Sequence, residues 1–119
     1  MSRPPVITAL LDANVLYPAP LRDYLLYLAS LGVYLPLWTA VIQDEWIKNL
    51  IEARPDLKRA ALEATQRSMD RAFPGSNITG YEFLIEGLSL PDPNDRHVLA
   101  AAIKGEAQVI VTANLKDFP

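Results

Sequence analysis

The sequence contains no cysteine and only one histidine among its 119 residues. The lack of cysteine excludes disulfide bonds, thiolate metal ligands and cysteine nucleophiles, and it is consistent with a reducing compartment. No apolar run approaches the length of a membrane span, and Asp12 interrupts the short apolar run that follows Met1–Pro5. We therefore expect neither a membrane span nor a signal peptide, and we predict a cytoplasmic protein.

The composition predicts a single folded domain covering residues 1–119. Half of the residues are hydrophobic and 21% are charged, which is typical of a globular chain of this length. The net charge of −3 argues weakly against a large nonspecific surface for nucleic acid. Six of the 11 basic residues nevertheless lie in one window with interleaved acids, and this window is either a solvated helix face or a surface that contacts phosphates. These residues are Lys48, Arg54, Lys58, Arg59, Arg67 and Arg71.

Hydrophobic patterning predicts alternating strands and helices. The predicted strands are Val6–Leu11, Val33–Trp38 and Ala107–Thr112, and the first three predicted helices are Ala19–Ser30, Ala40–Ala53 and Pro55–Phe73. A further helix lies in the stretch Leu90–Ile103, with Asp92 as its cap, Pro93 at its first position and Gly105 after its end. The segment Ile78–Gly87 is ambiguous between a short strand and a helical turn. This alternation favours an α/β fold in which helices cover a parallel sheet.

Polar residues gather where the predicted strands end and where a predicted helix begins. Asp12 follows the first strand, and Asp95 falls in the first turn of the helix that leads into the last strand. Because parallel strands end at one edge of a sheet, Asp95 can approach Asp12. Glu45 borders an apolar helix stripe, where a carboxylate needs a partner. The full set is Asp12, Asn14, Glu45, Asp92, Asp95, Asn114 and Asp117.

Two interpretations of these residues remain open. In the simpler one, Asp92 and Asp95 only cap a helix and complement its dipole, while Asp12 is a turn residue. In the other, the carboxylates crowd together and raise one another's pKa, which a divalent cation with oxygen ligands would relieve. Mg²⁺ and Mn²⁺ are the ions that suit such ligands and leave positions for phosphate oxygens.

Four segments, taken together, resemble the PIN-domain family, and most closely its bacterial members of the VapC-toxin type. They are Asp12–Pro18, Trp38-Thr39 with Glu45, Pro91–Ile103 and Val111–Phe118. The resemblance covers nearly the whole chain, and its specificity comes from the order and spacing of motifs that are individually short. It implies a three-layer α/β/α nuclease fold that cleaves RNA with Mg²⁺ or Mn²⁺. It further implies a toxin held in check by a protein antitoxin, often as a homodimer.

The resemblance also assigns roles to residues. Asp12, Glu45 and Asp95 match the first three acids of the family and would hold the metal and its attacking water. The fourth acidic place falls near Thr112–Asn114, where this sequence has an amide. This departure puts a second metal in doubt, with Asp92 or Asp117 as substitute ligands. Asn14, Thr112 and Asn114 would position the ligands or substrate.

Family members usually continue beyond the equivalent of Asp117-Phe118-Pro119 with at least another strand. Three alternatives follow for that edge of the sheet: it lacks a C-terminal strand, a partner fills it, or the strand belongs to a part of the protein that this sequence does not include. An unfilled parallel edge would favour association.

Two other readings compete with a metal-dependent nuclease. Asn114 in place of an acid motivates a catalytically silent PIN fold that binds RNA or protein. A phosphotransfer domain also places an aspartate after its first strand, but the motif match is poor because Asn14 stands where a phosphatase would have a second acid.

The histidine and the aromatic residues carry weaker signals. We expect His97 to pack or to be exposed rather than to act on substrate. We expect both tryptophans, Trp38 and Trp46, to lie in the core. The tyrosines that we expect mainly to pack are Tyr17, Tyr24, Tyr27 and Tyr34.

Overall fold

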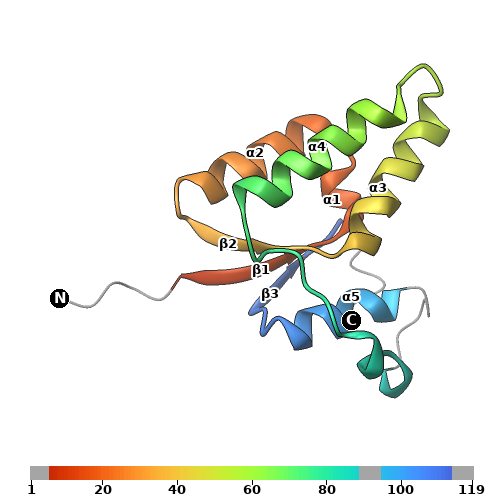
Figure 1. The fold of residues 1–119 in the computed structure, drawn as a ribbon. Helices are drawn as coiled ribbons and strands as arrows, with labels where there is room; N and C mark the ends of the chain where they lie inside the picture. The colour runs from red at the N-terminus through yellow and green to blue at the C-terminus, as the bar shows by residue number, and fades with distance from the viewer. Residues whose placement is uncertain (1–5, 89–94, 114–119) are drawn as a thin grey trace.

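A computed structural model describes residues 6–88 and 95–113 of the chain (Figure 1). Its centre is a three-stranded parallel sheet with the strand order β2-β1-β3. The strands are β1 (Ile7–Leu11), β2 (Tyr34–Leu37) and β3 (Val109–Val111). Leu10 pairs with Leu37 on one side and with Ile110 on the other, so β1 is the middle strand. Its last three residues are buried, as the continuous apolar pattern of a parallel strand predicts.

Helices cover both faces of the sheet, which gives the predicted three-layer α/β/α arrangement (Figure 1). One layer contains the helices α1 (Ala13–Leu16), α2 (Ala19–Ser30), α3 (Ala40–Ala53) and α4 (Arg59–Ala72). The other layer contains the 3-10 helix η1 (Glu82–Gly87) and the helix α5 (Arg96–Lys104). No helix of the described residues is long and apolar enough to cross a membrane.

Local chemistry explains why α3 begins at Ala40. Thr39 has an extended backbone, and its hydroxyl accepts a hydrogen bond from the Ile42 backbone N–H at 3.0 Å. This bond satisfies one of the backbone donors that a helix start leaves free. The apolar side of α3 then packs into the core through Ile42, Trp46 and Ile47. Glu45 is carried on the same helix, beside this buried side.

One hydrophobic core joins the two helical layers through the sheet. Leu10 and Leu11 of β1 are completely buried, as are Trp38 and Trp46, so the prediction that the tryptophans lie in the core is confirmed. The Trp38 indole N–H donates to Asp70 of α4 at 2.8 Å, which gives this buried polar group a partner. Tyr34 is also buried, but Tyr24 and Tyr27 are exposed, so the prediction that these two mainly pack is wrong.

Several element boundaries differ from the predicted ones. The helix predicted to open at Pro55 begins at Arg59, because the preceding residues form a turn in which the Leu57 N–H bonds to the Arg54 carbonyl. The ambiguous segment before residue 88 contains the 3-10 helix η1, and α5 begins at Arg96 with Asp95 at its N-cap position. The predicted caps Asp92 and Pro93 lie outside the described residues.

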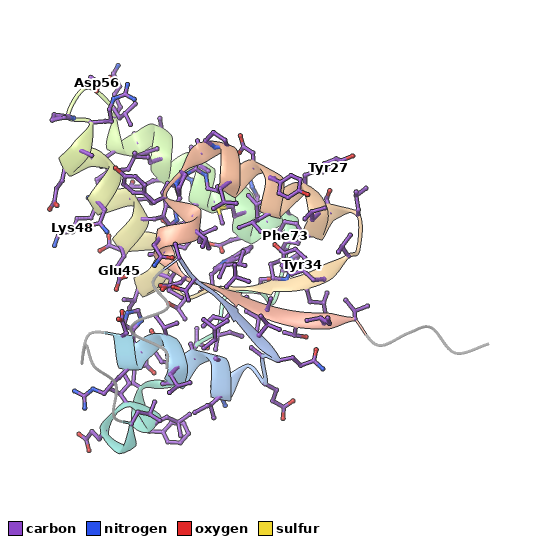
Figure 2. All side chains as sticks on the ribbon, turned by 180° about the vertical axis from the view of Figure 1, so that it is seen from behind. Tyr27, Tyr34, Glu45, Lys48, Asp56 and Phe73 are labelled. Carbon is purple, nitrogen blue, oxygen red and sulfur yellow. The ribbon has the colours of Figure 1, made fainter. Side chains whose placement is uncertain are left out.

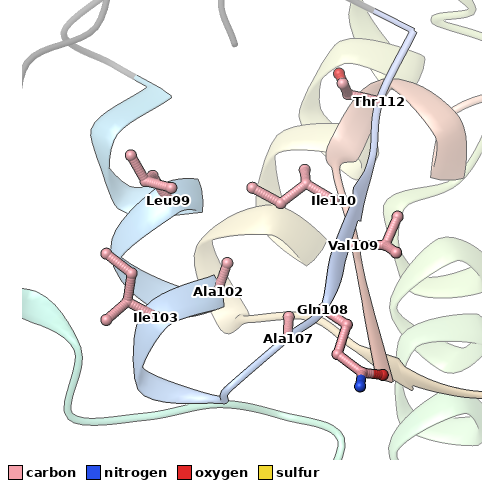
Figure 3. Close-up of a pocket in the computed structure, with 8 residues that line it drawn as sticks. All are labelled: Leu99, Ala102, Ile103, Ala107, Gln108, Val109, Ile110 and Thr112. Atoms are coloured by element: carbon pink, nitrogen blue, oxygen red, sulfur yellow. The ribbon is translucent and has the colours of Figure 1, made fainter. Parts of the chain in front are cut away.

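The strand β3 forms one edge of the sheet among the described residues. A mostly apolar hollow of about 410 Å³ lies beside this edge, between β3 and α5 (Figure 3). Its walls are Leu99, Ala102, Ile103, Ala107, Gln108, Val109, Ile110 and Thr112. The expected absence of a further C-terminal strand concerns residues beyond the described range and stays a prediction.

Candidate functional site

A pocket of about 310 Å³ lies at the carboxyl end of the sheet, where ligand sites of open α/β folds are found. It brings together residues from β1, α1, α3 and the start of α5, which are far apart in the sequence. The pocket is lined by Asp12, Ala13, Asn14, Tyr17, Glu45, Asn49 and Asp95. Below, this hollow is called the acidic pocket. The three carboxylates that the sequence predicted to meet therefore line one hollow.

Asp12 is held in place by backbone and side-chain donors. It follows the last residue of β1, and the residue as a whole is only 5% exposed. One carboxylate oxygen accepts the Ala13 backbone N–H at 2.7 Å, and the other accepts the Thr112 hydroxyl at 3.0 Å. Two fixed donors leave this carboxylate with a defined orientation.

Burial raises the pKa of Asp12 above its usual value of 3.8. The Ala13 and Thr112 hydrogen bonds favour the ionised form and lower the pKa, but they do not offset the loss of hydration. The nearby charge of Glu45 raises the pKa further by a smaller amount. Two neighbouring carboxylates thus repel each other in this pocket, which is the situation that a cation relieves.

Asn14 connects the start of α1 to the end of β3. Its amide N–H donates to the Thr112 hydroxyl oxygen at 3.1 Å, while its carbonyl oxygen accepts the Ala113 backbone N–H at 3.0 Å. The backbone N–H of Asp12 donates to the Val111 carbonyl in the same region. Through these bonds Asn14 and Thr112 fix the position of the Asp12 carboxylate.

Glu45 has a partner that the sequence did not reveal. Its carboxylate oxygen lies 2.8 Å from Nε2 of His97, a residue of α5 whose side chain is 13% exposed. Figure 2 shows Glu45 on α3 at the side of the molecule that faces α5. The expectation that a carboxylate here needs a partner is met by this contact, which joins the two helical layers. His97 is thus neither simply packed nor exposed.

The structure leaves three predicted site residues without a position. Asp92, Asn114 and Asp117 lie outside the described residues. The predictions that Asp92 or Asp117 is a substitute metal ligand therefore stay predictions. Three pocket residues were not predicted as site residues, and two of them, Tyr17 and Asn49, have polar side chains. Asn49 lies four residues after Glu45 on α3, so helical spacing alone can find it. Tyr17 was expected only to pack, and no sequence signal places it at the pocket.

Within residues 6–88 and 95–113, no three side chains of acidic or histidine type are close enough together to enclose a metal ion. The donor set still suits a hard divalent cation, because Mg²⁺ binds through one or two carboxylates and keeps several waters. Asp12 and Glu45 are two such carboxylates, and they are near enough to influence each other electrostatically.

Comparison with known proteins identifies the class to which this fold and site belong. A PIN-domain family profile matches residues 8–116, so the chain belongs to the PIN-domain family. One relative, named "Putative ribonuclease VapC50", from Mycobacterium tuberculosis, is 55% identical over 40 residues. That match spans 34% of this chain and only 23% of the relative's length. No solved structure matches the chain. The resemblance to VapC-type PIN proteins is therefore confirmed, and the sequence identity to this relative is restricted to 40 residues.

Proposed function

We propose that the chain is a divalent-metal-dependent ribonuclease that hydrolyses RNA phosphodiester bonds in the cytoplasm. One observation carries this proposal: Asp12, Glu45 and Asp95 line a single pocket at the carboxyl end of a parallel sheet. Membership of the PIN-domain family and a partial relative named as a ribonuclease support it. The family resemblance assigns the same three acids.

Each proposed role uses a contact of this chain. Asp12 and Glu45 would bind Mg²⁺ or Mn²⁺ directly, with Asp95 completing the negative wall of the pocket. Thr112 and Asn14 would hold Asp12 in its orientation, and His97 would hold Glu45. The bound cation would activate a water molecule and neutralise charge at the phosphate. Asp92, Asn114 and Asp117 remain proposed contributors from outside the described residues.

The proposal is tested by incubating the purified chain with a labelled RNA in Mg²⁺, in Mn²⁺ and in EDTA. We expect cleavage only with a metal, and we expect Asp12→Ala and Asp95→Asn to abolish it while circular dichroism shows an intact fold. Glu45→Gln should reduce the rate by at least about tenfold, because losing a direct metal ligand should cost no less than losing an outer-shell partner. Asp44→Asn is the matched control, because Asp44 lies on the same helix but pairs with Arg59 instead of lining the acidic pocket. Undiminished cleavage by the Asp12 and Asp95 variants would refute the proposed site.

The metal site itself is tested by calorimetric titration with Mn²⁺. We expect binding by the wild type and none by a folded Asp12→Ala variant. A catalytically silent binding module is the second candidate, because Asn114 stands where the family resemblance expects an acid. Such a module would bind RNA equally well in Mn²⁺ and in EDTA and would leave it uncut.

The family resemblance also suggests a biological role and partners. We propose that the protein is the toxin of a toxin–antitoxin pair, that a protein antitoxin restrains it, and that it forms a homodimer. Induced expression in a bacterial host should arrest growth for the wild type and not for Asp12→Ala. Light scattering on the purified chain should give the mass of two copies; a monomer at micromolar concentration would contradict the homodimer.

A further inference from the structure

A second hollow, of about 620 Å³, adjoins the acidic pocket. Tyr17 lines both hollows, and Asn49 of the acidic pocket is followed on α3 by Leu50 of the second. Apolar side chains form most of the second hollow, including Pro18, Leu50 and Leu62. Below, it is called the side pocket. A chain of nucleotides bound at the acidic pocket can therefore extend into it.

Arg22 on α2 is the unusual residue of the side pocket. It is 6% exposed, and its guanidinium lies over the Trp46 ring at 4.4 Å from the ring centre. One terminal nitrogen donates to the Leu16 carbonyl at 2.8 Å, while the Nε–H is buried and has no hydrogen-bond partner. Burying an arginine without full hydrogen bonding is costly.

No acidic side chain of the described residues forms an ion pair with Arg22. Its immediate neighbours are the Leu16 carbonyl and the Trp46 ring, neither of which carries a formal charge. Arg54, the other arginine of the side pocket, is different because it is paired with an acid. Its Nε and Nη2 atoms donate to the two carboxylate oxygens of Asp56, at 3.1 and 2.9 Å. Arg22 therefore has no ion-pair partner among the described residues, and the acid that acts on its charge is Asp23, the next residue of α2.

We propose that the side pocket binds the nucleotide next to the cleaved bond, with its phosphate on Arg22 and its base on the apolar wall. Arginine suits phosphate because its planar fork donates two parallel hydrogen bonds. Tyr17 and the prolines supply an uncharged surface on which a base can lie. This inference rests on the proposed function, since it names a part of the same substrate.

The test measures RNA binding in EDTA, where cleavage does not contribute. A fluorescein-labelled 12-nucleotide RNA of mixed sequence is titrated with the chain, and anisotropy is recorded between 50 and 200 mM salt. Arg22→Gln should bind about tenfold more weakly at low salt. It should also reduce the slope of log affinity against log salt by about 0.7, because one phosphate contact to a single strand is lost. Arg71→Gln, which makes the same change in net charge on α4, should leave the slope unchanged.

A second pair of variants does not depend on removing a buried residue. Ala53 is exposed and lines the side pocket near the end of α3, where either a glutamate or a glutamine is compatible with a helix. Ala53→Glu places a negative charge in the pocket and should weaken RNA binding about tenfold relative to Ala53→Gln, which has nearly the same size. This pair decides the question if Arg22→Gln does not fold.

The outcomes separate this inference from the proposed function. Equal binding by the two Ala53 variants, or an equal loss of slope in Arg71→Gln, would overturn the phosphate role of Arg22; cleavage by the wild type would then still support the ribonuclease. A folded Arg22→Gln that keeps the full slope would likewise overturn the phosphate role of Arg22. Arg22-dependent binding by a chain that cleaves no RNA would support the side pocket and contradict the nuclease. A chain that neither binds nor cleaves RNA would contradict both.

Discussion

Asp12 combines a titratable carboxylate with deep burial, and this combination costs stability. Its carboxylate is almost completely buried, and burial is the main reason that its pKa is raised. The folded protein therefore holds the Asp12 proton more tightly than the unfolded chain does. As the pH rises from below 3.8 through the folded pKa, the unfolded chain releases this proton first, so the free energy of unfolding falls. Above the folded pKa this loss of stability is complete.

Asp12→Asn should for this reason stabilise the protein at neutral pH. The amide keeps an oxygen that can accept the Ala13 N–H, and it carries no charge to desolvate. We expect a higher urea midpoint than that of the wild type at pH 7, and equal midpoints once the pH is below the usual aspartate value. Measured in the absence of metal, a lower midpoint at pH 7 would show that the carboxylate contributes net stability.

The residues of the acidic pocket were predictable to different extents. Asp12, Glu45 and Asp95 could be found because each stands at a strand end, a helix start or the border of an apolar stripe. The contact between Glu45 and His97 could not, because it joins two helices on different layers whose relative placement is set by the core. The burial of Arg22 in the side pocket could not be predicted either, since an arginine on an amphipathic helix is usually exposed.

At the scale of elements, the helices with complete local signals were predicted best. The observed bounds of α2 and α3 are the predicted ones, because an amphipathic stripe and, for α3, the Thr39 cap define them. The start of α4 was missed because Pro55 suits a helix start as well as a turn, and the Leu57–Arg54 backbone bond selects the turn. The apolar run before residue 88, Phe83–Ile85, is too short for its periodicity to distinguish η1 from a strand.

Thr39 provides a test of how α3 is anchored. Thr39→Ala removes the hydroxyl that accepts the Ile42 N–H in a completely buried position. We expect a loss of about 1 to 2 kcal/mol in the free energy of unfolding, measured by urea denaturation. Thr39→Ser keeps the acceptor and should lose much less. Equal losses in the two variants would assign the effect to the methyl group and its packing.

Gly105 ends α5 at a point where the layers approach closely. A methyl group added there would lie 2.9 Å from Leu37 Cδ1 and 3.1 Å from Ile78 Cδ1. Gly105→Ala should therefore destabilise the protein by about 1 to 3 kcal/mol through overpacking. Gly87→Ala is the control, because no atom lies within 4 Å of its added methyl group, and the smaller freedom of the unfolded chain should make it neutral or slightly stabilising. Thermal unfolding of the three proteins decides between these expectations.

At the scale of the whole molecule, the sequence predicted the architecture correctly. The apolar runs followed by amphipathic helices imply parallel strands with helical cover, and the sheet order β2-β1-β3 places Asp12 in its centre. The middle place of β1 agrees with the burial of its last three residues, Ala9, Leu10 and Leu11.

Because one core joins both helical layers, we expect the molecule to unfold as a unit. Far-ultraviolet circular dichroism follows all helices, whereas tryptophan fluorescence follows Trp38 and Trp46, which lie in the buried core. The two signals should give the same urea midpoint. Separate midpoints would show that α5 and η1 detach from the sheet before the other layer unfolds.

The long separation between Asp12 and Thr112 has a consequence for the growing chain. The hydroxyl that orients the Asp12 carboxylate is 100 residues away, and the pairing of β3 with β1 brings the two together. Contacts between such distant segments form late, since a large loop must first close. During synthesis, an emerging chain carries Asp12 and Glu45 before the strand that completes their pocket has been made. A nuclease built in this order would be harmless to the RNA that surrounds it until β3 has left the ribosome and paired with β1.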